Sequence, residues 1–190
     1  DVQSVCIDAL PLAFAACGQA FVIITGGIDL SIGSLMSLVN VVAARWMIHM
    51  SFREALLFAL LLVLAGALAG TLTGLLIVVT RVADIIVTLA MLFVWAGAAL
   101  AVLTIPGGGA PIRFGSLVTV DTIATKWFPS ALLILAVVVA IIWLPLKRSR
   151  AGLALYAIGS NRNAAYLAGV NVSAARVGAY ALSGTFAALG

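Results

Sequence analysis

Six long runs without a charged side chain divide the sequence, and they constrain its fold more than any other feature. The runs cover residues 9–28, 30–44, 55–80, 85–104, 127–146 and 177–190. A helix needs about 20 mostly apolar residues to cross the hydrocarbon core of a bilayer. The runs therefore predict an all-α fold, a polytopic transmembrane helix bundle with about five to six apolar segments.

The composition excludes the other broad classes of fold. Of the 190 residues, 65% are hydrophobic and 8% are charged, whereas a soluble globular domain carries about 25% charged residues. So few charges cannot cover a surface that faces water. A disordered chain is excluded as well, because disordered segments are poor in hydrophobic residues and rich in charge.

No part of the sequence offers the residues that a catalytic or metal site needs. Cys6 and Cys17 match no metal-binding or redox spacing. His49 has no partner at ligand or triad spacing. The motifs of metalloproteases, serine hydrolases, phosphate-binding loops and dinucleotide-binding folds are absent from the sequence. We therefore expect neither an enzyme nor a cofactor or metal ion.

Basic residues gather in one segment between two apolar runs. Residues 147–176 contain no acidic side chain, and their basic residues are Lys147, Arg148, Arg150, Arg162 and Arg176. The flanking apolar runs argue against nucleic acid as a partner and favour a cytoplasmic loop, since such loops are rich in Lys and Arg. Alternation of the spans then makes residues 105–126 an external loop. It also places Arg45 and Arg53 outside, against the charge rule.

The second apolar run is short and follows the first across a single acidic residue. The connecting segment, residues 26–34, reads GGIDLSIGS, and its glycines permit a sharp break in the backbone. Two full spans joined by a tight turn, or one span followed by a half-helix, both fit this pattern. Asp29 or Ser31 can cap the helix that follows. The alternative is a functional carboxyl group inside the membrane.

Three glycines form a ladder in the third run. Gly66, Gly70 and Gly74 are spaced by four residues and so lie on one face of a helix. The missing side chains let a second helix approach closely. The ladder predicts helix packing and indicates no particular function.

A second acidic residue lies between the third and fourth runs. Asp84 follows Arg81 by three residues, so the two can pair across one helical turn. We expect a solvated pair in a loop at the membrane surface. An aspartyl protease of the membrane would need Asp84 as a second carboxyl group at the depth of Asp29.

A short helix is predicted inside the basic loop. Asn161 or Asn163 can serve as its N-cap, and Gly169 suits the left-handed turn that ends it. A longer helix restarts at residues 171–173. A short helix between two spans either rests on the lipid surface or docks a cytoplasmic partner, and the residues alone support both interpretations.

Four stretches, in order along nearly the whole chain, match the pattern of one family. They read ITGGIDLSIGS at 24–34, IVTL at 86–89, YAIG with Asn161 at 156–161, and AAYLAGVNV at 164–172. With these residues the chain resembles the permease subunit of bacterial ATP-binding-cassette importers for ribose and related sugars. The resemblance implies a single transmembrane permease domain over residues 1–190 in the bacterial inner membrane.

The resemblance also implies a mechanism, partners and sites. The chain would move a pentose or furanose-like sugar by alternating access, together with a second permease subunit, cytoplasmic ATP-binding subunits and a periplasmic sugar-binding protein. The loop at 147–176 would contain the coupling helix, which fits a groove on the ATPase. The residues assigned to this coupling are Gly159, Asn161, Asn163, Ala164, Ala165, Leu167 and Gly169. The residues expected near the translocation pathway are Gly26, Gly27, Asp29, Ser31 and Gly33.

The chain departs from the family pattern in sequence and in extent. Thr73 stands where the family usually has Asn, residues 82–84 replace a proline-rich turn, and Ser160 replaces a glycine. The family's first helix and closing third have no counterpart, so we expect an incomplete permease. Two alternatives stay open: an ion-coupled secondary transporter that uses Asp29 or Asp84, and a truncated membrane protein without transport activity.

Overall fold

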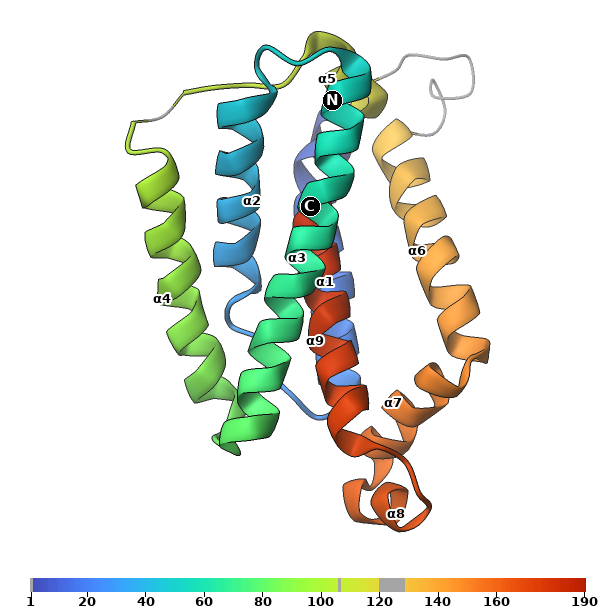
Figure 1. Ribbon diagram of the computed structural model, residues 1–190. Helices are drawn as coiled ribbons and strands as arrows, with labels where there is room; N and C mark the ends of the chain where they lie inside the picture. Colours follow the sequence, from blue (N-terminus) through green and yellow to red (C-terminus); the bar gives the residue numbers. More distant parts are fainter. Residues whose placement is uncertain (1, 106, 120–128) are drawn as a thin grey trace.

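The computed structural model describes residues 2–105, 107–119 and 129–190, which form a bundle of helices without strands (Figure 1). The helices are α1 (Val2–Ile24), α2 (Ile32–Met47), α3 (Phe52–Thr80), α4 (Asp84–Val102), α5 (Ile112–Thr119), α6 (Ser130–Arg148), α7 (Arg150–Ser160), α8 (Arg162–Leu167) and α9 (Val172–Leu189). Within the described residues, α1, α3, α4 and α6 are long and apolar enough to cross a membrane, and α2 is a shorter apolar helix. The prediction of a polytopic helix bundle is confirmed.

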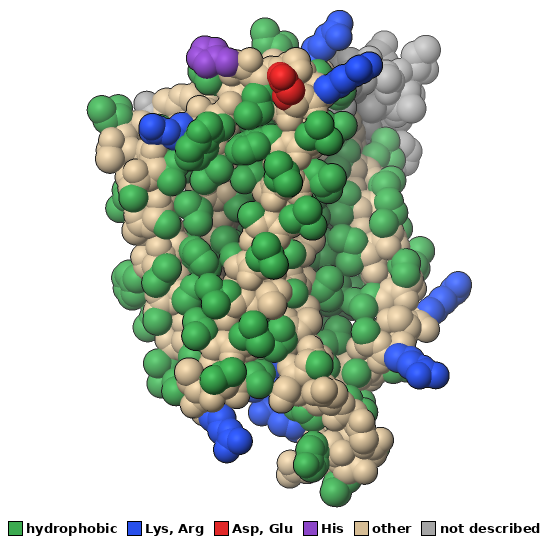
Figure 2. Space-filling model, viewed as in Figure 1, with side chains coloured by type: hydrophobic (Ala, Val, Ile, Leu, Met, Phe, Trp, Pro, Cys, Tyr) green, Lys and Arg blue, Asp and Glu red, His purple; other side chains and the backbone are tan. Residues whose placement is uncertain are grey.

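The long helices run between two ends of the bundle. Helix α5 lies at one end and α8 projects from the other (Figure 1); we call these the α5 end and the α8 end. Helices α1, α3 and α6 run toward the α8 end, while α2, α4 and α9 run back. Hydrophobic side chains cover the belt between the ends, and Lys and Arg lie toward the ends (Figure 2). The alternation agrees with the predicted order of the spans.

The two ends differ in charge. The α8 end carries Arg81, Lys147, Arg148, Arg150, Arg162 and Arg176 at helix termini. The α5 end carries Arg45, Arg53 and Arg113. The Arg45 side chain donates a 2.8 Å hydrogen bond to the carbonyl of Val102 at the end of α4 and lies 5.6 Å above the Trp46 ring. Both contacts stabilise a cation, which gives Arg45 a local reason to lie at this end.

Several predicted boundaries were wrong. Helix α1 ends at Ile24, before the glycines, and α2 has 16 residues, or about 24 Å at 1.5 Å per residue. The expected external loop contains α5, and the expected basic loop contains α7 besides α8. Helices α5 and α7 could not be predicted from runs of apolar residues because both are short. Helix α7 also begins at a polar cap, where the Ser149 hydroxyl accepts a 3.1 Å hydrogen bond from the Gly152 amide.

Helix α9 lies at the centre of the bundle, against the glycine ladder of α3. Gly66, Gly70 and Gly74 are all buried. A Cβ atom at Gly66 would lie 2.5 Å from the carbonyl oxygen of Gly184, and one at Gly70 would overlap the carbonyl oxygen of Tyr180. The two backbones are therefore in direct contact. On another face, Phe186 of α9 packs its ring 5.6 Å from the ring of Phe21 in α1.

Candidate functional site

The connection between α1 and α2 is an irregular segment in which Gly27, Asp29 and Ser31 are buried while Gly26, Ile28 and Leu30 are exposed. We call residues 26–31 the GGIDLS segment. Gly26 has a φ of +76°, a conformation that glycine adopts without strain. A Cβ atom at Gly27 would lie 2.8 Å from a carboxyl oxygen of Asp84 and 3.0 Å from the Tyr180 hydroxyl. Only glycine therefore lets the segment approach α4 and α9 so closely.

The carboxyl group of Asp29 is buried and fully hydrogen-bonded. Its exposed fraction is 6%. One oxygen accepts bonds from the amide (2.9 Å) and the hydroxyl (2.7 Å) of Ser31, and the other accepts a 2.8 Å bond from the hydroxyl of Ser183 in α9. Ser31 is the N-cap residue of α2 but its side chain makes no capping bond. Of the two residues predicted to cap α2, Ser31 makes no capping bond because its hydroxyl donates to Asp29, whereas the Asp29 carboxyl group accepts the Ser31 amide directly before the helix.

Asp84 forms a second polar link to α9. It is the first residue of α4 and not part of a loop, and its carboxylate pairs with Arg176. The hydroxyl of Tyr180 lies 2.9 Å from the other carboxyl oxygen of Asp84 and 3.2 Å from the carbonyl of Ile28. The expected pair with Arg81 was wrong, because α9 brings Arg176 to Asp84 from 92 residues away.

The two carboxyl groups connect the GGIDLS segment and α4 to α9. Asp29 and Asp84 each accept a hydrogen bond from a side chain of α9. Among the described residues no group of three His, Cys, Asp or Glu side chains can hold a metal ion. Cys6 and Cys17 are free thiols.

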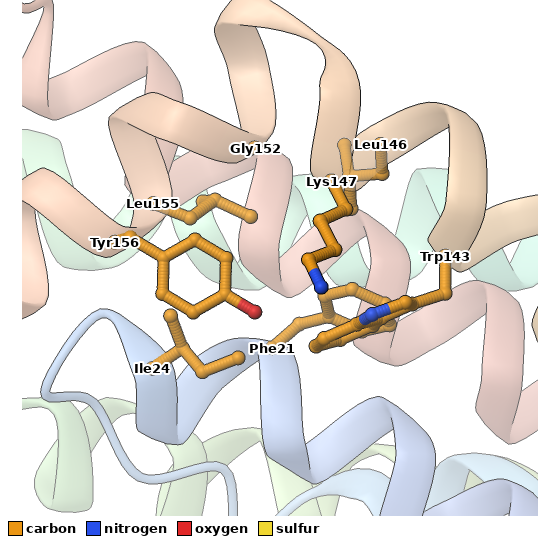
Figure 3. A pocket seen from close by; sticks show the side chains of 8 residues that line it. All are labelled: Phe21, Ile24, Trp143, Leu146, Lys147, Gly152, Leu155 and Tyr156. Atoms are coloured by element: carbon orange, nitrogen blue, oxygen red, sulfur yellow. The ribbon is translucent and has the colours of Figure 1, made fainter.

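Helix α7 is fixed to the bundle by aromatic packing (Figure 3). The Phe21 and Trp143 rings lie 5.2 Å apart, and Tyr156 of α7 meets Trp143 edge-on at 6.5 Å. The cavity between these side chains holds about 10 Å³, which is room for one water molecule at most. It is too small for a sugar, so we assign these residues to packing.

The last turn of α7 touches the end of α1. A Cβ atom at Gly159 would overlap the carbonyl oxygen of Ile24, the residue at which α1 ends. The GGIDLS segment begins two residues later. The connection from α7 to this segment therefore runs through backbone atoms in direct contact. Because close-packed atoms compress little, a displacement of α7 would be passed on to the segment.

Helix α8 is the predicted short helix of the basic loop. The Asn161 side chain accepts a 3.0 Å bond from the Ala164 amide, and Gly169 has a φ of +82°. Ala165 is buried at 5% exposure, whereas Leu167 is 84% exposed. Asn163, Ala164 and Gly169 are exposed. Asn171 then caps α9 by accepting a 3.0 Å bond from the Ala174 amide.

Three residues of α9 hold the site together and were not predicted from the sequence as site residues. Arg176, Tyr180 and Ser183 bind Asp84 and Asp29. Their spacing of four and three residues places them on one face of a helix. A polar stripe in an apolar helix is a signal that could have found them. By contrast Gly33, expected near the pathway, has no atom within 4 Å of an added Cβ.

Replacing Ser183 by alanine tests the link between α9 and Asp29. The Ser183→Ala change removes one of three donors to a buried carboxylate, and a hydrogen bond to a charged group contributes about 1.5–3 kcal/mol. We expect a lower melting temperature of the detergent-solubilised protein. Thr185→Ala is the matched control, because Thr185 bonds only to Ala181 of its own helix. Equal effects of the two changes would argue against the link.

The fold and this site define a multi-pass membrane protein with an exposed helical projection at one end. The family described as branched-chain amino acid transport system / permease component matches residues 2–190. The chain belongs to this family.

Curated relatives agree with this assignment. The ribose import permease RbsC of Bacillus subtilis is 36% identical over 99% of this chain and 56% of its own length. RbsC of Escherichia coli K12 is 32% identical over 93% of the chain and 55% of its own length. The galactofuranose transporter permease YtfT of Escherichia coli K12 is 30% identical over 95% of the chain and 52% of its own length. The predicted resemblance to ribose-type sugar permeases of ATP-binding-cassette importers is confirmed.

The relatives also show the extent of the match. The chain spans about half the length of the curated relatives it matches. These relatives are named as permeases. No solved structure matches the chain.

Proposed function

We propose that the chain is part of the permease of an ATP-driven importer in the bacterial inner membrane. It would move a pentose or furanose-like sugar by alternating access. The printed names of the relatives, which include ribose and galactofuranose permeases, support the substrate class. The proposed partners are a second permease subunit, cytoplasmic ATP-binding subunits and a periplasmic sugar-binding protein.

The observation that carries this proposal is the connection from α8 to the GGIDLS segment. Helix α8 is joined at one side to α7, whose Gly159 touches Ile24. At the other side it leads into α9, whose Tyr180 and Ser183 bind the segment. A partner that pushes α8 therefore acts on the segment from two directions. A contiguous set of contacts of this kind can carry coupling between α8 and the segment.

The charge of the α8 end supports the orientation. Arg81 and the five basic residues of the 147–176 segment lie there, and basic residues near span ends favour the cytoplasmic side. Under this proposal α8 faces the cytoplasm, where an ATPase subunit would bind it. Residues 147–176 then form the coupling region.

Leu167→Asp tests the coupling proposal. Leu167 is 84% exposed, so the change leaves the bundle intact and places a charge where an apolar contact with the ATPase is proposed. We expect at least a tenfold loss of sugar uptake and of ATPase binding, with normal insertion of the full permease into membranes. Uptake into proteoliposomes and pull-down of the ATPase measure the two effects.

The matched control is Ile48→Asp. Ile48 is an exposed apolar residue beyond α2 at the α5 end, away from the proposed ATPase. ATPase binding should survive this change. Ala165→Asp is not a clean test, since Ala165 is buried within the α7–α8 region and its replacement would unfold α8 itself. Unchanged uptake in Leu167→Asp would contradict the coupling proposal.

One observation favours the ion-coupled alternative, and it can be tested in the same vesicles. The three hydrogen bonds to the Asp29 carboxyl group come from neutral donors. A proton- or cation-coupled carrier would use such a carboxyl group. Uptake that continues without the ATPase and collapses with the proton gradient would support that alternative. Uptake that requires ATP hydrolysis would exclude it.

A further inference from the structure

A cavity with arginine side chains lies at the α8 end, between the α3–α4 turn and the start of α9. Its volume is about 540 Å³. Arg81, Asp84, Arg162 and Arg176 supply the charged part of its lining, and Ile77 and Val172 are among the apolar residues. We call it the arginine pocket. The proposed transport function uses Arg81 and Arg162 only as part of the basic charge at the α8 end.

The arginine pocket has an excess of positive charge. Three arginines and one carboxylate line it, and that carboxylate is already bound by Arg176 and Tyr180. The Arg81 and Arg162 side chains form no ion pair or hydrogen bond within the described ranges. The buried Nε of Arg176 has no acceptor there either. The cavity therefore repels cations and attracts an anion.

The backbone at Arg81 gives a second reason to look for a ligand. Arg81 ends α3 in the left-handed conformation, with a φ of 57°, and no other non-glycine residue in the described part has a positive φ. Glycine is the usual residue at such a helix end. Compared with glycine, arginine strains the backbone here and adds a guanidinium group at the rim of the pocket.

The position of the arginine pocket in the bundle indicates which kind of anion it can bind. It lies where α3 ends and α4 begins, and both helices are long enough to cross a membrane. This is the depth of lipid headgroups. Its wall includes arginines, whose guanidinium groups can form two parallel hydrogen bonds to phosphate oxygens. It also includes apolar side chains, which suit the glycerol backbone and the first carbons of the acyl chains. A neutral sugar would not use the excess charge.

We propose that the arginine pocket binds the phosphate of an anionic phospholipid headgroup. Basic pockets between membrane helices on the cytoplasmic side are suited to such headgroups. The Arg81 and Arg162 side chains would contact the phosphate, and Arg176 would remain paired with Asp84. Free inorganic phosphate offers the same oxygen atoms to the arginines. The experiment must therefore test whether the lipid portion of the ligand contributes to binding.

Native mass spectrometry of the full permease tests the proposal. Binding of phosphatidylglycerol is compared with binding of phosphatidylcholine for the unchanged protein and for Arg81→Gln/Arg162→Gln. We expect about a tenfold loss of the preference for phosphatidylglycerol in the double variant. Lys147→Gln/Arg148→Gln is the matched control, because it removes the same charge at the same end outside the arginine pocket, and it should retain the preference.

Further arms separate the other outcomes. Arg81→Gly/Arg162→Gln relieves the backbone strain and should raise the melting temperature while losing the lipid preference, so a folding defect cannot explain the loss. Equal loss in the control pair would overturn the proposal. Binding of inorganic phosphate as tight as that of phosphatidylglycerol would overturn the lipid source. Weaker ATPase binding by the double variant in phosphatidylcholine nanodiscs, with unchanged lipid preference, would show that a partner protein occupies the pocket.

Discussion

Replacement of Gly70 by alanine is expected to drive α9 away from α3 and to abolish uptake. The added Cβ would overlap the carbonyl oxygen of Tyr180 and lie 3.1 Å from the amide nitrogen of Gly184. Both are backbone atoms that cannot rotate aside. Overpacking in a well-packed core costs about 1–3 kcal/mol or more. Because α9 also carries Tyr180 and Ser183, its displacement would release the GGIDLS segment as well.

The control for Gly70→Ala is Gly97→Ala in α4. An added Cβ at Gly97 meets no atom within 4 Å. Both changes replace a helical glycine and gain the same intrinsic helix propensity, about 1 kcal/mol, so their difference isolates the contact with α9. Thermal unfolding in detergent and uptake in proteoliposomes measure the two effects. Equal behaviour of the two variants would contradict the central place of α9.

The elements that the sequence predicted well are those with a local cause. Long apolar runs predict membrane-spanning helices. The Asn161 side chain caps α8, and Gly169 ends that region in the left-handed conformation. Each of these features depends on residues within one or two turns. The short helices α5 and α7 were missed because hydropathy counts respond to length and charge and not to a few amphipathic turns.

The site could be predicted only in part because its contacts join distant residues. GGIDLS was singled out by its glycines and its one carboxyl group, but its partners Ser183 and Tyr180 lie more than 150 residues further along the chain. The sequence predicted the nearby Arg81 as the partner of Asp84, whereas in the structure Asp84 pairs with Arg176. Local spacing could not show this, since the choice depends on how the glycine ladder places α9.

The neutral double variant Asp84→Asn/Arg176→Gln is expected to be more stable than either single variant. The two side chains are 17% and 13% exposed, so each single change leaves a charge without its partner in a poorly hydrated place. Breaking such a buried pair costs about 3–5 kcal/mol. Removing both charges avoids the unpaired charge; asparagine keeps the volume of Asp84, while glutamine is shorter than Arg176.

A double-mutant cycle on melting temperature and uptake separates the two roles of this pair. Residues in contact show coupling free energies of about 0.5–3 kcal/mol, and additive effects would show that the pair is not formed in the membrane. If the pair only stabilises the bundle, the double variant should regain uptake together with stability. If the charges also hold α4 to α9 while α8 moves, stability should return without uptake. The proposed coupling route predicts the second result, because Arg176 lies between α8 and the residues of α9 that bind the GGIDLS segment.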